Sequence, residues 1–149
     1  MSDLFSSNNF SVGQEYYIKV WTGSSGGGTC QIAFNTTFIP PDTTITQLTV
    51  NTWVDGNLLT LSSQQWFKFT ATARTQYIHV SFSTFYSYFY IQVYDSSGDV
   101  VVNQTSFSDS TRYVSMTVTE GQEYYIRVNN YSYSGTYRIA FNTSETPPP

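Results

Sequence analysis

The sequence predicts an all-β fold, an antiparallel β-sandwich of the jelly-roll type with an additional N-terminal β-hairpin. Apolar and polar residues alternate along most of the chain, which is the pattern of half-buried strands. Turn-forming residues recur roughly every 8–12 positions, and no stretch shows the period of a helix. A phrase near the N-terminus also returns near the C-terminus, and such a repeat fixes how a chain divides into units.

The repeat consists of two linked segments. Residues 13–20 (GQEYYIKV) return as 121–128 (GQEYYIRV), and residues 28–35 (GTCQIAFN) return as 135–142 (GTYRIAFN). The offset is 108 residues for the first segment and 107 for the second, so the loop between them is one residue longer in the first copy. The chain therefore reads as one whole unit preceded by the final part of another.

Paired prolines mark the boundary between the two parts. Pro40-Pro41 follows the first copy, and Pro147-Pro148 follows the second. Such pairs cannot join a sheet ladder, and they stiffen a linker. We assign residues 1–39 to a partial repeat, the C-terminal hairpin of a preceding unit, and residues 40–149 to a complete unit with a Pro-rich tail. Residues 1–10 lack the basic start and apolar centre of a signal peptide, and we expect the chain to be a segment of a larger precursor.

The partial repeat carries an apolar face without the strands that would cover it. Tyr16, Ile18 and Val20 alternate with polar or outward residues, and Ile32 and Phe34 supply the inward face of the returning strand. An isolated hairpin is at best marginally stable in water. We expect these five residues to be an assembly surface, in the same chain or on another one.

The complete unit contains a regular series of expected strands. They cover residues 45–50, 52–54, 66–71, 77–82, 88–95, 100–102 and 113–118, and a closing hairpin spans 124–128 and 137–141. Asp55-Gly56-Asn57 and Ser96-Ser97-Gly98 are expected turns. The alternation assigns these residues to the core: Phe67, Phe69, Ala71, Ile78, Val80, Phe82, Phe89, Ile91, Val93, Val114, Met116, Val118, Tyr124, Ile126, Val128, Tyr137, Ile139 and Phe141.

The composition excludes several classes of function. Only 11% of the residues are charged and 18% are aromatic, whereas ordinary domains carry about 25% charged residues. This balance is common in extracellular β-proteins, and we expect a secreted or cell-surface location. The net charge is −4 and the six basic residues are scattered, so we expect no nucleic-acid binding. No apolar run reaches the roughly 20 residues of a membrane span, so we expect no membrane insertion.

The residues do not predict an enzyme. A catalytic histidine needs an orienting carboxylate and a nucleophile near it, and the only histidine, His79, is expected on the outward face of a strand. The only cysteine, Cys30, occupies an inward position, where we expect a small buried hydrophobe with an inert thiol. No catalytic residue is assigned.

Outward aromatic residues are the candidate ligand-binding group. Tyrosine and tryptophan offer rigid, amphipathic surfaces that suit a protein or a glycan. Cross-strand aromatic pairs also stabilise sheets without a ligand, and a neighbouring repeat or the first hairpin could cover them. The candidates are Trp66, Tyr88, Tyr90, Tyr94 and Tyr125, with Tyr131 and Tyr133 in the last loop.

Asp95 and Asp99 are weaker candidates for a calcium site. Calcium takes six to eight oxygen ligands, often from loops of this kind. The spacing falls short of an EF-hand, and Asp-Ser-Ser-Gly is also ordinary turn chemistry. We expect no other cofactor.

The order of motifs resembles a known family. The motifs at residues 66–71 (WFKFTA), 77–80 (YIHV) and 90–98 (YIQVYDSSG), followed by the closing hairpin, resemble the bacterial pre-peptidase C-terminal (PPC) domain. The resemblance implies a secreted, non-catalytic β-sandwich, often attached to proteases or repeated in surface proteins. Clostridial collagen-binding modules look like relatives that use surface tyrosines for collagen and calcium for stability. Many members open the strand before the Asp95 turn with an acidic residue, whereas this chain has Tyr90.

Two functions follow as hypotheses. The first is a non-catalytic extracellular module for adhesion or for protein or carbohydrate binding in a repeat-containing bacterial protein. The alternative is a structural subunit that assembles head to tail into a filament or array, because an unpaired apolar hairpin can complete the sheet of a neighbour.

Overall fold

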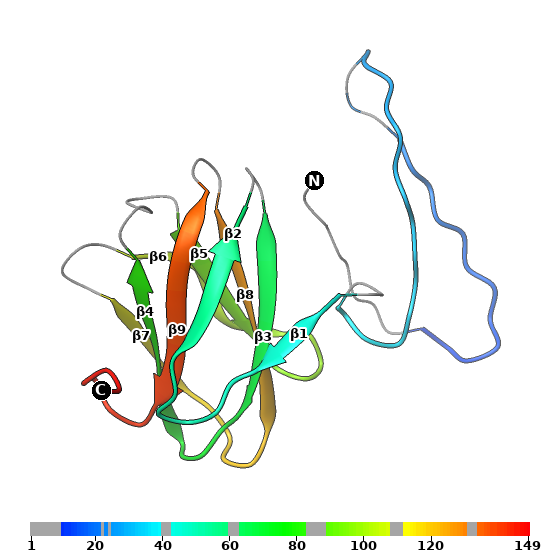
Figure 1. Cartoon of the computed structure of the whole chain (residues 1–149). Helices are drawn as coiled ribbons and strands as arrows, with labels where there is room; N and C mark the ends of the chain where they lie inside the picture. Colours follow the sequence, from blue (N-terminus) through cyan, green and yellow to red (C-terminus); the bar gives the residue numbers. More distant parts are fainter. Residues whose placement is uncertain are drawn as a thin grey trace.

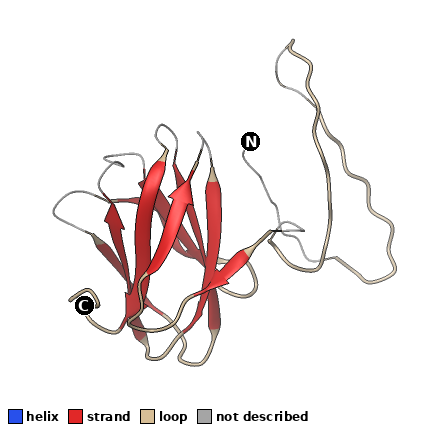
Figure 2. Ribbon diagram, in the orientation of Figure 1, coloured by secondary structure: helices blue, strands red, loops and turns tan. Residues whose placement is uncertain are grey.

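The protein is seen in a computed structural model that describes residues 10–21, 23, 25–39, 43–59, 63–82, 89–107, 112–130 and 134–149, without the side chain of Gln104. Within these residues nine strands form two sheets packed face to face, and no helix is present. Figure 1 shows the two layers, and Figure 2 shows that all strands belong to the sandwich. The prediction of an all-β sandwich is confirmed.

The first sheet, called sheet A, has five strands in the order β1-β3-β8-β5-β6. Neighbours are antiparallel except for β1 and β3, which run parallel. The strands are β1 (Ile45–Gln47), β3 (Gln64–Thr70), β5 (Phe89–Tyr94), β6 (Val100–Ser106) and β8 (Glu123–Asn130).

The second sheet, called sheet B, has four antiparallel strands in the order β2-β9-β4-β7. The strands are β2 (Val54–Leu58), β4 (Thr75–Phe82), β7 (Tyr113–Thr117) and β9 (Gly135–Asn142).

The core lies between the sheets and contains the residues that the alternation assigns to it, together with Leu48, Leu58, Val102 and Phe107, which were not predicted. Phe69, Ile78, Ile91, Ile126 and Ile139 are fully buried. All the other predicted inward residues belong to the same cluster or pack against it. The period of two therefore identifies correctly which side of each strand faces the core.

The expected closing hairpin is not a hairpin. β8 pairs with β3 and β5 in sheet A, whereas β9 pairs with β2 and β4 in sheet B. The segment from β8 to β9 is therefore an arch, called the second arch, whose two strands face each other across the core. Alternation predicts two strands and their inward faces, but it carries no information on whether consecutive strands pair with each other.

The expected turn at Asp55-Gly56-Asn57 lies inside β2 instead. Gly56 is opposite Tyr137 of β9, and a Cβ on Gly56 would lie within 2.6 Å of Cε1 of the Tyr137 ring. Glycine is needed here because the ring occupies the space of a side chain, which is a common reason for glycine inside a strand.

The described residues between 10 and 39 form an extended arm, most of which stands away from the sandwich (Figure 1). No strand is assigned in the described part of this segment, so the expected N-terminal hairpin does not form a ladder. Since the second arch divides its strands between two sheets, its first copy has no reason to pair internally. We call residues 10–21 and 25–39 the two limbs of the arm.

The turn that leads into each copy has the same structure. Residues 11–14 and residues 119–122 each form a turn in which the amide of the fourth residue donates to the carbonyl of the first at 3.2 Å. The third residue is Gly13 in one and Gly121 in the other, both with φ of 82°. A positive φ at this position defines a type II turn and favours glycine.

A tyrosine hydroxyl fastens each leading turn. The amide of Ser11 donates to Oη of Tyr16 at 2.9 Å, and the amide of Thr119 donates to Oη of Tyr124 at 2.9 Å. The two bonds are related by the 108-residue offset. The local fold at the start of the arch is therefore formed in both copies.

An asparagine closes each copy. Nδ2 of Asn35 and of Asn142 donates to the carbonyl four residues later, at 2.9 Å in both copies. The side-chain oxygen accepts from the amide two residues later, at 3.1 Å for Asn35 and 3.0 Å for Asn142. These bonds hold the chain in a turn as it leaves the arch.

Candidate functional site

The outer face of sheet A carries the aromatic cluster from which a ligand surface was predicted. Trp66 of β3 and Tyr94 of β5 are each only 3% exposed. Phe38 and Ile39, which end the arm, pack against them together with Ile45. Trp66 and Tyr94 face away from the main core as expected, and the end of the partial repeat covers them, which is one of the alternatives that the sequence left open.

Phe38 lies at the centre of this cover. Its ring centroid is 6.0 Å from that of Trp66 and 5.4 Å from those of Tyr94 and Tyr125. On another side, a Cβ on Gly98 would come within 3.0 Å of the Phe38 side chain. The cluster is therefore packed like a small second core rather than left open as a binding platform.

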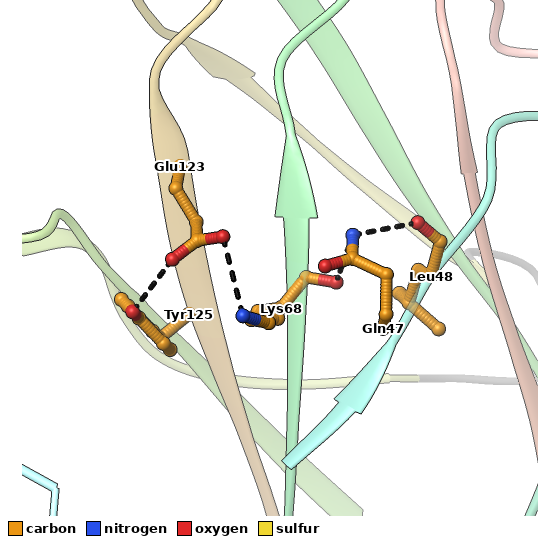
Figure 3. Close-up of polar contacts among 5 residues, drawn as sticks. All are labelled: Gln47, Leu48, Lys68, Glu123 and Tyr125. Carbon is orange, nitrogen blue, oxygen red and sulfur yellow. Dashed lines mark hydrogen bonds and ion pairs between the residues drawn. The ribbon is translucent and has the colours of Figure 1, made fainter.

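Tyr125 lies at the half-buried edge of the cluster, and Figure 3 shows its polar contacts. Its hydroxyl donates to Oε1 of Glu123 at 2.7 Å, and Oε2 of Glu123 lies 3.4 Å from Nζ of Lys68. The hydrogen bond to Glu123, then partial burial, then the charge of Glu123 raise the pKa of Tyr125 to about 12. Burial likewise raises the pKa of Tyr94, although the charge of Arg127 opposes that shift.

The remaining aromatic candidates are few. Tyr90 is half-buried on β5. Tyr88, Tyr131 and Tyr133 lie outside the described residues. The described structure therefore leaves Tyr90 and Tyr125 as the partly accessible members of the predicted ligand-binding group.

His79 is buried rather than exposed, which corrects the sequence-based expectation. It projects from the outer face of sheet B, where only 2% of it is accessible. Its Nε2 lies 2.9 Å from Oδ1 of Asn142 and 3.0 Å from the carbonyl oxygen of Ser144. Because both partners are acceptors, Nε2 carries the proton and donates to them. The histidine fixes the C-terminal tail to the sheet.

Two further contacts hold the same tail. Nε1 of Trp53 donates to the carbonyl of Pro148 at 2.9 Å. The Arg138 guanidinium lies 4.7 Å from the centre of the Trp53 ring. The alternation along β4 placed His79 on the correct side of the sheet, but it could not indicate that a distant segment would cover it.

The described residues of the arm are exposed up to Thr37, and only Phe38 and Ile39 at its end are covered. Cys30, which was expected to be buried, is an exposed free thiol. The reason is that the strands that bury its counterpart Tyr137 have no equivalent around the arm. The predicted assembly residues have these exposed fractions: Tyr16 49%, Ile18 70%, Val20 57%, Ile32 56% and Phe34 90%.

The Asp95 loop is an ordered turn. Oδ1 of Asp95 accepts from the amide of Ser97 at 2.9 Å and from the amide of Asp99 at 3.0 Å. The Asp95 amide donates to the carbonyl of Asp99 at 3.0 Å, and Gly98 has φ of 89°. The Asp95 carboxylate therefore caps the turn, and a calcium ion would have to share it.

The described part of the chain contains no group of three or more His, Cys, Asp or Glu residues placed to hold a metal. A shallow, open hollow of about 540 Å³ lies at one end of the sandwich, where Arg74, Glu120 and Tyr124 contribute to its lining. The Tyr124 hydroxyl is already bonded to the Thr119 amide. Within the described residues, no helix is long and apolar enough to cross a membrane.

One polar network was not predicted from the sequence. The hydroxyl of Tyr137, whose pKa burial raises, donates to Oε1 of Gln65 at 2.6 Å. The same oxygen accepts from the amide of Asn57 at 2.9 Å. This network and the absence of a side chain at Gly56 together form a close-fitting site for the Tyr137 ring. A glycine among alternating strand residues was a signal that could have indicated it.

No protein-family model and no curated protein sequence matches this chain. Among solved structures, the pre-peptidase C-terminal domain of a collagenase from Bacillus anthracis matches with a TM-score of 0.52 and 18% identity, over 69% of this chain and 99% of that domain. PliG from Aeromonas hydrophila, a periplasmic inhibitor of g-type lysozyme, matches with a TM-score of 0.46 and 13% identity, over 65% of this chain and 95% of PliG. The sandwich therefore has the fold of a pre-peptidase C-terminal domain, as the motifs in the sequence imply.

Proposed function

We propose that this chain is a non-catalytic interaction module of a secreted or cell-surface protein, and that it associates through its N-terminal arm. The observation that carries the proposal is a difference between equivalent residues. Ile18 and Phe34 are 70% and 90% exposed, whereas their counterparts Ile126 and Phe141 are 0% and 2% exposed. Within the described residues, the arm presents a largely exposed core face, on which only the Phe10 ring packs, against Tyr16.

The exposed face is large enough to support association. Full burial of one Ile, Val or Phe side chain contributes about 1.5–3 kcal/mol, and the arm carries five such positions if Tyr16 is included. Association costs roughly 4–15 kcal/mol in lost freedom of motion. Burial of the whole face offsets a cost of this size, and burial of part of it gives only weak binding.

Binding of a glycan or a matrix protein to the aromatic face has less support. Trp66 and Tyr94 are covered by Phe38 and Ile39, which leaves Tyr90 and Tyr125 as partly accessible rings. Two separate half-buried tyrosines form a poor platform compared with the arm.

A non-catalytic role fits the chemistry of the described residues. His79 is buried and engaged with Asn142 and Ser144. Cys30 lies on the arm, whereas the only histidine of the sequence, His79, belongs to β4. The extracellular setting rests on the low charge of the chain, its hydroxyl-rich composition and the resemblance to PPC domains.

The test is light scattering across a wide concentration series. The wild-type chain should associate weakly as its concentration rises, and the double variant Ile18→Asp/Phe34→Asp should remain monomeric. Thermal melting should be the same for both proteins, since the arm is not part of the sandwich. A wild-type chain that stays monomeric at every concentration would contradict self-association through the arm.

A further inference from the structure

The second arch occupies a defined slot in the sandwich. Its first strand, β8, lies between β3 and β5, and its second strand, β9, lies between β2 and β4. Without the arch, sheet A would consist of the separate pairs β1-β3 and β5-β6, and sheet B of β2 and the pair β4-β7, so the arch joins the two parts of each sheet. Both strands of the arch form backbone hydrogen bonds to a neighbouring strand on each edge. No other strand of the fold can take the place of the arch.

The arm has the features that this slot requires. It repeats the core residues of the second arch at Tyr16, Ile18, Val20, Ile32 and Phe34. Its leading turn and its closing turn have the same hydrogen bonds as those of the second arch. The leading turn is formed although no sheet holds it, and the closing turn is formed where Ile39 packs on sheet A. The arm is therefore already folded at both ends. Preformed ends reduce the ordering cost of binding.

Among the inward positions of the repeated segments, one differs between the two arches. Cys30 in the arm corresponds to Tyr137, whose ring lies directly over Gly56. In a slot with glycine at this position, the arm would leave the space of a phenol ring empty. A large-to-small change of this kind favours the resident arch by about a hundredfold or more. The slot of this module therefore prefers its resident arch to the arm.

We infer that the arm is a donor arch for the slot of a second molecule with this architecture, and that the residue at the Gly56 position decides which arch a slot accepts. The partner is a β-sandwich whose residue at that position is larger than glycine and fills the space above Cys30. This inference rests on the proposed function, because it names the surface that the exposed arm contacts.

The observed position of the end of the arm favours insertion into a second molecule over insertion into the slot of the same molecule. Phe38 and Ile39 are packed on the outer face of sheet A, whereas the closing turn of the second arch lies beside His79 on sheet B. If the arm entered its own slot, Asn35 would have to move to the sheet B side and draw Phe38 off Trp66. A second molecule can accept the arm while that cover stays in place.

The full-length variant Gly56→Phe tests the inference. It moves the aromatic ring from β9 to the opposite strand, so that a Phe–Cys pair can replace the Gly–Tyr pair with similar volume. In this variant the Tyr137 ring collides with the new side chain, and the arm should enter the slot of another molecule. We expect oligomers by light scattering, and Cys30 should be protected from a thiol reagent that labels it in the wild-type chain.

The matched control is Gly56→Phe/Tyr137→Cys, in which the resident arch fits again. This variant should be monomeric, with Cys30 labelled and the cysteine introduced in place of Tyr137 protected, as mapped by mass spectrometry of the peptides. A labelled Cys30 in Gly56→Phe would overturn the inference. A monomer with protected Cys30 would place the arm in its own slot and would overturn the assignment to a second molecule.

A second variant avoids any change to the sandwich. Cys30→Tyr gives the arm the ring that fits Gly56, and after refolding at high concentration it should yield far more oligomer than the wild type, through an association constant about a hundredfold larger. An equal yield would contradict the slot model. If the wild type still associates through Ile18 and Phe34 in that case, the proposed function stands and only the slot assignment fails.

Discussion

The arm and the second arch are nearly the same sequence in two environments. Both form the same leading turn, the same tyrosine-to-amide bond and the same asparagine turn. Between these ends the second arch is buried in two sheets, whereas the arm has no strand and is exposed. The comparison separates what a local sequence specifies from what its neighbours supply.

The turns are specified locally. A glycine with positive φ and a tyrosine five residues after the first turn residue form the leading turn in both copies, although only the second copy is held in a sheet. An asparagine before the exit forms the closing turn in both copies. The strands are not specified locally, because a ladder needs partners on its edges and a β-strand alone buries little apolar surface. Substitutions at equivalent positions should therefore have different effects in the two copies, and three pairs test this.

The largest difference is expected for Ile126→Asp and Ile18→Asp. Ile126 is fully buried in β8, so an aspartate there places an unpaired carboxyl in the core and should lower the free energy of unfolding by at least about 4 kcal/mol. Ile18 is 70% exposed, and its replacement should change the free energy of unfolding by less than about 0.5 kcal/mol. Urea denaturation followed by tryptophan fluorescence measures both.

Dilute protein is needed in that experiment, so that association of the arm does not add to the measured stability. Comparable destabilisation by the two substitutions would mean that the arm is packed on the sandwich in solution, which would contradict the exposed arm.

The alternation of apolar and polar residues predicted correctly on which face of a sheet a residue lies. It did not predict which of the outer residues are buried by other segments. It placed His79, Trp66 and Tyr94 on the outer faces, where they are, but it could not show that residues distant in sequence cover them. Cys30 illustrates the reverse case, since its pattern is that of a core residue whose partners are missing. A period of two indicates on which face of the sheet a residue lies. Whether that residue is buried depends on what packs against the face.

Strand pairing was the second limit. The sequence predicted a hairpin from two successive strands, whereas β8 and β9 lie in different sheets. Gly56 was interpreted as a turn for a similar reason, because Asp-Gly-Asn is typical of turns and the opposing Tyr137 is about 80 residues away in the sequence. The PPC resemblance, carried by the order of several motifs, predicted the fold despite these local errors.

An intermediate difference is expected for Asn142→Ala and Asn35→Ala. The Asn142 side chain is buried and accepts from His79 and from the Ser144 amide. Its loss should lower the free energy of unfolding by about 1–3 kcal/mol, because buried polar groups lose their partners. The equivalent bonds of Asn35 are exposed or only partly buried, and water can replace them, so the loss should be within about 0.5 kcal/mol.

Thermal melting of the two variants under identical conditions checks this pair. A destabilisation by Asn35→Ala as large as that by Asn142→Ala would show that the closing turn of the arm, through Ile39, contributes to the stability of the sandwich and is not merely a local structure.

The smallest difference concerns Tyr125 and its counterpart Tyr17, which is 90% exposed. The pKa of Tyr125 is raised to about 12, chiefly by its hydrogen bond to Glu123, above the value of about 10 in an unfolded chain. Below pH 10 both states keep the proton and the contribution to stability is complete. Between pH 10 and pH 12 the unfolded state releases its proton first, so this contribution declines as the pH rises and is lost above about pH 12.

Tyr125→Phe should therefore reduce the fall in unfolding free energy between pH 10 and pH 12, whereas Tyr17→Phe should leave it unchanged. Because Tyr125 is partly exposed and solvent screens its interaction with Glu123, the effect should not exceed about 1 kcal/mol. Urea midpoints measured at several pH values across this range check it. Other buried tyrosines, such as Tyr94, contribute a decline of the same sign, so the informative quantity is the difference between the two variants. If their pH profiles coincide, the Glu123 bond does not hold in solution, and the outer face of sheet A is more open than the packed cluster indicates.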